Sequence, residues 1–170
     1  MAKLNDEEKI QYLKRSYSAV DGLWFMKVED SYDFDKALEI DNEVWKVVPK
    51  IQARFLKSVL GVGKGLEALE QCFSEKLQLD DIEFEVKREE NILTITIFRC
   101  HWHELMVNSN REHLSPSIGA TICNTEYSGW AQEFGEGISF KILSKLCDGN
   151  KECLLQFSEK SQFPGTNLPN

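Results

Sequence analysis

The stretch that decides the fold is residues 82–98, which reads IEFEVKREENILTITIF. Apolar and charged side chains alternate over residues 82–87, and a period of two is typical of a half-buried β-strand. Residues 89–91 (Glu-Glu-Asn) predict a turn, and the β-branched run 92–98 predicts the partner strand. The middle of the chain therefore predicts an antiparallel hairpin.

The chain before this hairpin has a helical period. Apolar residues recur at steps of three and four in three segments, along Ile10, Leu13, Tyr17, Val20 and Trp24, along Ala37, Ile40, Val44, Val48, Ile51, Phe55 and Val59, and along Leu66, Leu69, Phe73 and Leu77. Pro49 predicts a kink or break in the second segment, because proline has no amide proton for the helical hydrogen bond. We therefore expect helices throughout the first half.

The chain after the hairpin predicts one more helix and a second hairpin. Ser115-Pro116 is typical of a helix start, and the pattern runs on towards Gly135. Residues 138–143 and 153–157 are strand-like and flank the turn Asp148-Gly149-Asn150. The fold class expected is α+β, with N-terminal helices packed on an antiparallel sheet made of two hairpins. We expect one domain over residues 1–158 and a flexible tail over residues 159–170.

Length and charge limit the possible functions. The chain has 170 residues, with 20 Lys and Arg against 28 Asp and Glu, for a net charge of −8. Such an acidic protein has no general electrostatic attraction to nucleic acid or to anionic membranes, so neither is an expected partner. No apolar stretch approaches the roughly 20 residues that span a bilayer, and the acidic N-terminus does not resemble a signal peptide, so a cytoplasmic location is expected.

Four of the five cysteines follow residue 99, at positions 100, 123, 147 and 153. Cys147 and Cys153 flank the turn of the last predicted hairpin, so their sulfur atoms should lie close together. In a reducing cytosol, converging thiolates and imidazoles are zinc ligands rather than disulfide partners. The alternative is that these cysteines, like Cys72, are ordinary small apolar core residues.

The segment from Gly119 to Phe157 resembles the end of the 4-vinyl reductase domain, a small-molecule-binding module with one cysteine in a late helix and two in a terminal hairpin. The resemblance implies that Cys123, Cys147 and Cys153 hold zinc beside a pocket for an aromatic effector. In sensor proteins of this kind a glutamate completes the site three residues before the first hairpin cysteine, but Ser144 occupies that position here. The fourth ligand is therefore open between Glu126, Cys100, His103 and water.

The whole chain also resembles an uncharacterised prokaryotic family related to 2-aminothiazoline-4-carboxylate hydrolases. The matching positions are Val20–Lys27, Ala37–Asp41, Lys50–Arg54, Cys100, Cys123, Glu126, Tyr127, Cys147 and Cys153. That family tends to have a proline after its first cysteine, where this chain has His101. If the strand before it continued, His101 and His103 would share one face.

These features together predict a zinc-binding domain for a small aromatic or heterocyclic molecule. The expected apolar walls of its pocket are Trp24, Trp102 and Tyr127, with His103 and Glu126 as polar anchors. A second copy of the chain is a possible partner. A thiolate-rich zinc favours a structural role over a catalytic one.

Two alternatives remain open. The first is a metal- or cysteine-dependent hydrolase acting on a small cyclic C–N bond. In it Cys100 and His103 would act as nucleophile and base, or Glu126 would activate a zinc-bound water. The second is an iron–sulfur protein that uses four cysteines. No established catalytic sequence motif supports an enzyme.

Overall fold

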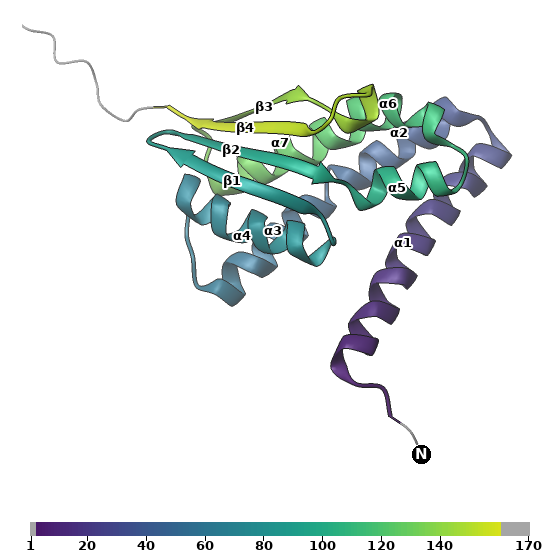
Figure 1. The fold of residues 1–170 in the computed structure, drawn as a ribbon, viewed down its shortest axis with the longest axis horizontal. Helices are drawn as coiled ribbons and strands as arrows, with labels where there is room; N and C mark the ends of the chain where they lie inside the picture. Colours follow the sequence, from purple (N-terminus) through teal and green to yellow (C-terminus); the bar gives the residue numbers. More distant parts are fainter. Residues whose placement is uncertain (1–2, 161–170) are drawn as a thin grey trace, which may run out of the picture. The chain divides into compact units, whose positions relative to one another are not determined.

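The computed structural model describes residues 3–160 of the chain (Figure 1). By backbone contacts the chain divides into two compact units, Met1–Val44 and Trp45–Asn170. The sheet and the cysteines all lie in the second unit. The two units are described in turn.

The first unit is helical, as its sequence period predicts. Helix α1 (Asp6–Ser31) begins with a capping box, in which the Asn5 side chain accepts from the Glu8 amide and the Glu8 carboxylate accepts from the Asn5 amide. Helix α2 (Phe34–Trp45) follows, and Phe34 packs against Phe25 with their ring centroids 5.9 Å apart. No residue of α1 is buried.

The predicted break at Pro49 is confirmed, although the helix is interrupted two residues before the proline itself. Helix α2 ends at Trp45, and helix α3 (Val48–Leu60) places Pro49 in its first turn, where a missing amide proton costs no hydrogen bond. Gly61 caps the end of helix α3, and its φ of 67° lies in the left-handed region that favours glycine. Helix α4 (Leu66–Leu79) is the third predicted helix.

A four-stranded antiparallel sheet follows, which confirms the α+β class. The first hairpin is β1 (Glu83–Glu89) and β2 (Ile92–Arg99), and the second is β3 (Ile138–Ser144) and β4 (Cys153–Glu159). The strand order is β1-β2-β4-β3, so the pairing of β2 with β4 joins the hairpins into one sheet. This pairing brings Ile97 opposite Cys153.

The segment between the hairpins differs from the sequence prediction. Helix α5 (His101–Asn108) begins directly after β2, so the expectation that His101 and His103 share a strand face is wrong. Two residues turn a helix by about 200°, which puts these side chains on different faces. The predicted helix from Ser115 to Gly135 is three pieces: α6 (Ser115–Ile118), the π-helical turn η2 (Gly119–Cys123) and α7 (Asn124–Phe134).

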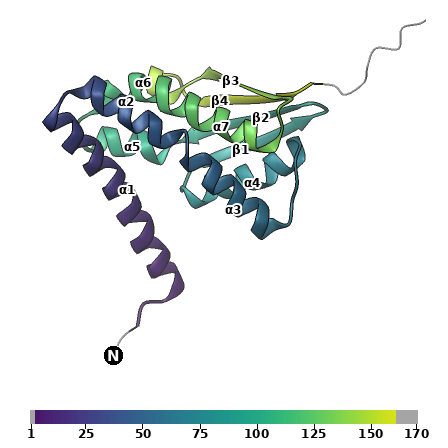
Figure 2. The same cartoon turned by 180° about the vertical axis from the view of Figure 1, so that it is seen from behind.

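Helices α4 and α7 cover one face of the sheet, and α3 packs on both of them (Figures 1 and 2). The core lies between these two layers. Its largest fully buried side chains include Trp130, Phe73, Phe134 and Phe157. The Phe73 ring makes edge contacts with Tyr127, Trp130 and Phe157 at 5.2–5.5 Å. Burial of each large side chain contributes about 1.5–3 kcal/mol, so this cluster is the main source of stability.

The last strand extends slightly beyond the predicted domain boundary. Glu159 is the final residue of β4, and its amide donates to the Asn91 carbonyl at 2.9 Å. The rest of the predicted tail, from residue 161 on, lies outside the described residues. Within the part of the chain that is described, none of the helices combines the length and the apolar character needed to cross a membrane.

Candidate functional site: a four-cysteine cluster beside a buried ion pair

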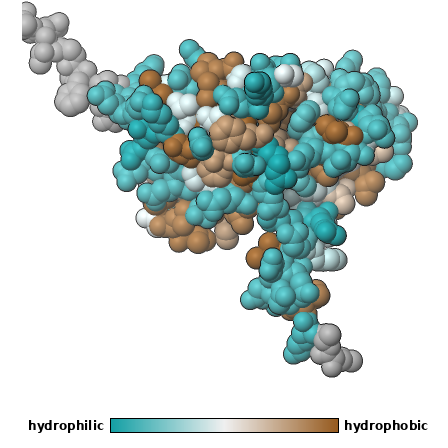
Figure 3. All heavy atoms as spheres, viewed as in Figure 1, coloured by the Kyte–Doolittle hydropathy of each residue, from teal (hydrophilic) through white to brown (hydrophobic). Residues whose placement is uncertain are grey.

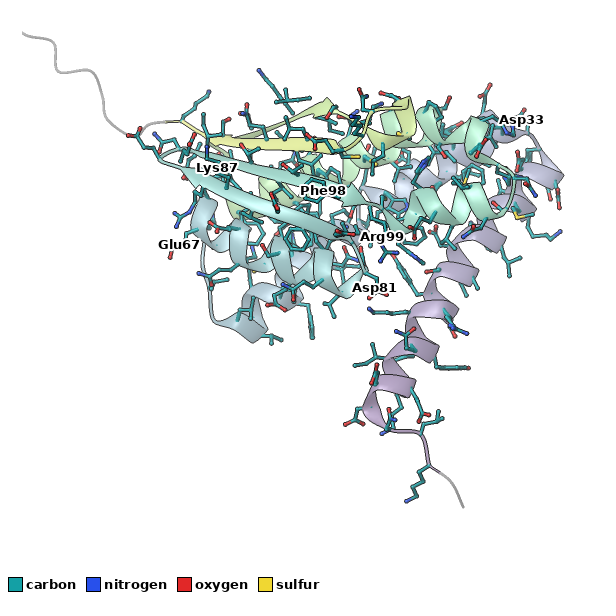
Figure 4. All side chains as sticks on the ribbon, in the orientation of Figure 1. Asp33, Glu67, Asp81, Lys87, Phe98 and Arg99 are labelled. Atoms are coloured by element: carbon teal, nitrogen blue, oxygen red, sulfur yellow. The ribbon has the colours of Figure 1, made fainter. Side chains whose placement is uncertain are left out.

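Four cysteines from separate elements lie at one end of the sheet. Cys153 is the first residue of β4 and lies opposite Ile97 of β2. Phe98 and Arg99, labelled in Figure 4, end the strand β2, and Cys100 follows as the N-cap of α5. The pairing of β2 with β4 thus brings Cys100 and Cys153 to the same sheet end.

Cys123 and Cys147 meet at Gly119. A Cβ atom added to Gly119 would lie 2.7 Å from the Cys147 Sγ and 4.0 Å from the Cys123 Sγ. Both sulfur atoms are therefore within about 4 Å of one point, and only a glycine leaves room for this approach. Cys147 itself lies in the short helix η3 (Leu146–Asp148), just after the end of β3.

Two of the sulfur atoms accept backbone hydrogen bonds. The Leu146 amide donates to the Cys153 Sγ at 3.2 Å, which joins the two sides of the last hairpin beside Cys147. The amides of His103 and Trp102, in the first turn of α5, donate to Cys100. Such bonds favour the thiolate form of these two cysteines over the thiol.

The cysteines are nevertheless held as thiols when no cation is present. Burial raises the pKa of Cys100 and of Cys147, and it raises the pKa of Cys153 to about 11. The pKa of Cys123 is raised well above its usual value, first by burial and then by the charges of Glu126 and of the three other cysteines. The other three cysteines are therefore near enough to Cys123 for their charge to affect its pKa.

The donor set fits zinc in its chemistry, although zinc binding is not shown. All five cysteines are free thiols. Among residues 3–160, no three or more His, Cys, Asp or Glu side chains already stand in the arrangement that a metal ion requires. A divalent cation would favour the thiolate form of its cysteine ligands, and soft sulfur donors select zinc or iron–sulfur clusters.

Glu126 is engaged elsewhere. Its Oε1 lies 2.6 Å from the Lys76 Nζ, and the two side chains are only 6% and 4% exposed. Lys76 also contacts Asp80 at 3.0 Å, and its ammonium lies over the rings of Phe73 and Tyr127. Burial lowers the pKa of Lys76, but the charges of Glu126 and Asp80 outweigh that effect and raise it overall. Lys76 is therefore a permanent cation inside the core.

The structure distributes the expected pocket residues among different environments. Tyr127 is buried in the core between Phe73 and Phe140. Trp102 packs edge-on against Trp45, with ring centroids 6.1 Å apart. His103 lies in α5 next to Cys100, and within the described residues its buried Nδ1 has no hydrogen-bond partner. Trp24 belongs to the first unit and is 62% exposed.

The sequence argument missed Lys76 and Gly119. Lys76 falls on the apolar stripe of α4, between the buried residues Phe73 and Leu77, and a lysine at a core position is a signal for a buried partner. Gly119 gave no sequence signal, because its role arises from Cys147, which lies far along the chain. The π-helical turn that holds Gly119 and Cys123 is of a kind often found at functional sites.

The geometry does not favour a nucleophilic thiol. A reactive cysteine needs a lowered pKa, and burial raises the pKa of Cys100. Glu126, the other candidate base, forms the ion pair with Lys76.

Comparison with known proteins adds a fold likeness and a family. Four chains of solved structures match. One is the phenol-responsive sensory domain of the transcription activator PoxR, crystallised with phenol, with a TM-score of 0.50 and 10% identity over 85% of this chain and 75% of that one. At this identity the likeness shows the fold alone. A search of curated proteins found no match. The model of a family of unknown function (DUF6125) matches residues 3–158, so the chain belongs to that family.

Proposed function

We propose that this protein is a binding domain for a small aromatic or heterocyclic molecule, built around a zinc ion. The proposed metal ligands are Cys123, Cys147 and Cys153, with Cys100 as the fourth. The observation that supports the zinc is the approach of the Cys123 and Cys147 sulfur atoms to one point beside Gly119, within about 4 Å of each. A bound divalent cation would favour the thiolate form, which burial disfavours at Cys123.

Cys100 suits the fourth position better than Glu126. The Glu126 carboxylate is within 2.6 Å of the Lys76 ammonium, and pulling it away would leave a buried lysine without that partner. Cys100 is coupled electrostatically to Cys123, Cys147 and Cys153 and needs no such exchange. Four thiolates on Zn²⁺ give a closed site with little Lewis acidity, so the metal would be structural.

The proposal of an organic ligand rests on the fold and on two polar atoms. The PoxR domain has a similar fold and was crystallised with phenol. In this chain the His103 Nδ1 and the Trp130 Nε1 are buried and make no hydrogen bond within residues 3–160. Buried polar groups normally have partners, and a phenolic hydroxyl can both donate and accept a hydrogen bond.

The zinc proposal is tested by elemental analysis of the purified protein. We expect about one zinc ion per chain, and loss of most of it in Cys147→Ser/Cys153→Ser. Cys72→Ser is the matched control, because Cys72 is buried in α4 and the charges that shift its pKa are those of Lys57 and Glu75, not those of other cysteines. Gly119→Ala keeps every thiol but displaces the Cys147 Sγ, and it should also lower the zinc content. Equal metal content in all four proteins would refute the site, and visible absorption with iron would assign an iron–sulfur cluster instead.

The ligand proposal is tested by calorimetric titration with phenol. We expect saturable binding that weakens about tenfold in Trp130→Phe, which removes the indole N–H together with part of the ring, and similarly in His103→Ala. Trp45→Phe is the control for loss of a buried indole that is not an expected pocket residue. No heat of binding for phenol or a set of related phenols, in a protein that retains its metal, would reject this part of the proposal.

A further inference from the structure

Helix α1 carries an exposed apolar stripe. Its members recur at steps of three, four, three and four residues, and they are Ile10, Leu13, Tyr17, Val20 and Trp24. Each is between 41% and 68% exposed, and none of the 26 residues of α1 is buried. Figure 3 shows hydrophobic residues on the surface of this helix among hydrophilic ones. Aromatic and branched side chains in such a row mark an interaction surface.

The spacing of the stripe is that of a coiled coil. Alternate steps of three and four place these residues at the first and fourth positions of a seven-residue repeat. In a coiled coil the side chains at these two positions face the partner helix. In the described part of the first unit, helix α2 contacts α1 through Phe25 and Phe34, and Phe25 is not a member of the stripe. A helix of 26 residues is about 39 Å long, which is enough for such a pair.

We propose that the stripe of α1 pairs with α1 of a second copy of this chain, with the two helices antiparallel. In the register centred on Tyr17 and Val20, Tyr17 of each copy faces Val20 of the other, and Leu13 faces Trp24. In each of these two pairs a large side chain lies opposite a smaller one. The same pair of contacts occurs twice, as the two-fold symmetry of a homodimer requires.

The charges that flank the stripe select the antiparallel orientation. In that register Lys14 of one copy faces Asp21 of the other, and Lys9 faces Asp30, so every flanking charge pair is attractive. Two parallel helices would instead place Lys9 beside Lys14, which repel each other. The ion pairs inside one helix, such as Lys9 with Asp6, are exposed and can exchange for these.

The buried area and the net charge favour a second copy over a membrane. Ten stripe side chains from two copies would remove roughly 1,000 Å² of surface from water, which is the lower limit for a specific interface. Helix α1 carries six acidic residues against four basic ones, so an anionic lipid surface would repel it. Helices that bind such surfaces are rich in Lys and Arg.

The primary experiment is sedimentation velocity of the full chain over a range of concentrations. We expect a dimer with a dissociation constant in the micromolar range, and a loss of at least tenfold in affinity for Leu13→Asp. Tyr12→Asp is the matched control, because Tyr12 is the neighbouring residue, is equally exposed at 67% against 64%, and lies off the stripe. Neither side chain is buried, so circular dichroism should show both variants folded.

A charge substitution tests the orientation. Lys14→Glu would place a negative charge opposite Asp21 of the other copy in the antiparallel pair. The repulsion should weaken the dimer about tenfold. In a parallel pair the same change would replace Lys9–Lys14 repulsion with attraction and strengthen the dimer. Lys14→Glu/Asp21→Lys should restore the affinity only in the antiparallel case.

Three results would overturn the proposal. The first is a monomer at every concentration. The second is an equal effect of Leu13→Asp and Tyr12→Asp on association. The third is binding of the monomer to phosphatidylserine vesicles that is lost in Leu13→Asp, which would assign the stripe to a membrane surface.

Discussion

At the scale of single residues, the unusual feature is a lysine inside the core. Lys76 is held by Glu126 at 2.6 Å and by Asp80 at 3.0 Å, and its ammonium faces two aromatic rings. Burial raises the pKa of Glu126, and the contact with Lys76 lowers it, so each group of the pair depends on the other for its charge. The pair also lies next to Cys123, whose pKa Glu126 raises.

Removal of this lysine should be costly. We expect Lys76→Met to lower the free energy of unfolding by about 3–5 kcal/mol, because it leaves two carboxylates in or near the core without their cation. The measurement is urea unfolding followed by circular dichroism. Lys76→Met/Glu126→Leu should recover part of the loss, and the exposed Lys87→Met should change stability by less than about 0.5 kcal/mol. A loss for Lys76→Met no greater than for Lys87→Met would contradict the ion-pair account.

At the scale of elements, one carboxylate ties α3 to α7. Glu133 of α7 accepts from Arg54 of α3 at 2.7 Å and 3.0 Å, and Lys57 of α3 donates to the Glu133 carbonyl at 2.7 Å. The hydrogen bond from Arg54 is the main reason that the pKa of Glu133 is lowered. The contact thus reinforces the packing of α3 on α7 beside the close approach of Gly129 to Pro49.

This contact makes a defined contribution to the pH dependence of stability. Because the folded pKa of Glu133 lies below its unfolded value, the stabilisation is present above the unfolded pKa and is lost as pH falls through the folded pKa. We expect Glu133→Gln to lower the Tm by about 2 °C at pH 7 and by less at pH 2.5. Thermal melts at both pH values test this, and a gap of the same size in acid would show that packing, not charge, is responsible.

At the scale of the whole molecule, the sheet determines where the cysteines meet. The hairpins join through β2 and β4, and this junction gathers Cys100, Cys153 and the η3 segment at one end of the sheet. A metal bound there would link β4, α5, η3 and the residue that precedes α7. No disulfide joins these described elements, because their cysteines are free. Under the zinc proposal the metal should therefore stabilise the fold of the second unit as a whole.

Removal of the metal should then destabilise the protein. We expect a chelator to lower the free energy of unfolding by about 4 kcal/mol, the value for an ion present at a thousand times its dissociation constant, and added zinc to restore it. Calorimetric melts measure the effect. The chelator should leave the melting of Cys147→Ser/Cys153→Ser unchanged, and a wild-type protein that contains metal but melts at the same temperature without it would exclude a structural role.

The sequence by itself determined the strands of both hairpins and the helices that precede them. The periods of residues 66–79 and 82–98 are set by the face that each segment buries, so they are visible without the rest of the fold. The same reasoning predicted the α+β class and the break near Pro49, whereas Cys123, Cys147 and Cys153 were implied as metal ligands by the resemblance to the 4-vinyl reductase domain.

Only the tertiary structure decided which of these side chains meet. Helix α5 begins where a strand seemed to continue, the predicted long helix contains a π turn, and Glu126 pairs with a lysine 50 residues earlier. Each outcome depends on contacts between residues that are distant along the chain. Local spacing sets the direction of a side chain within its own element, but the distance between two elements is fixed only when the core has packed.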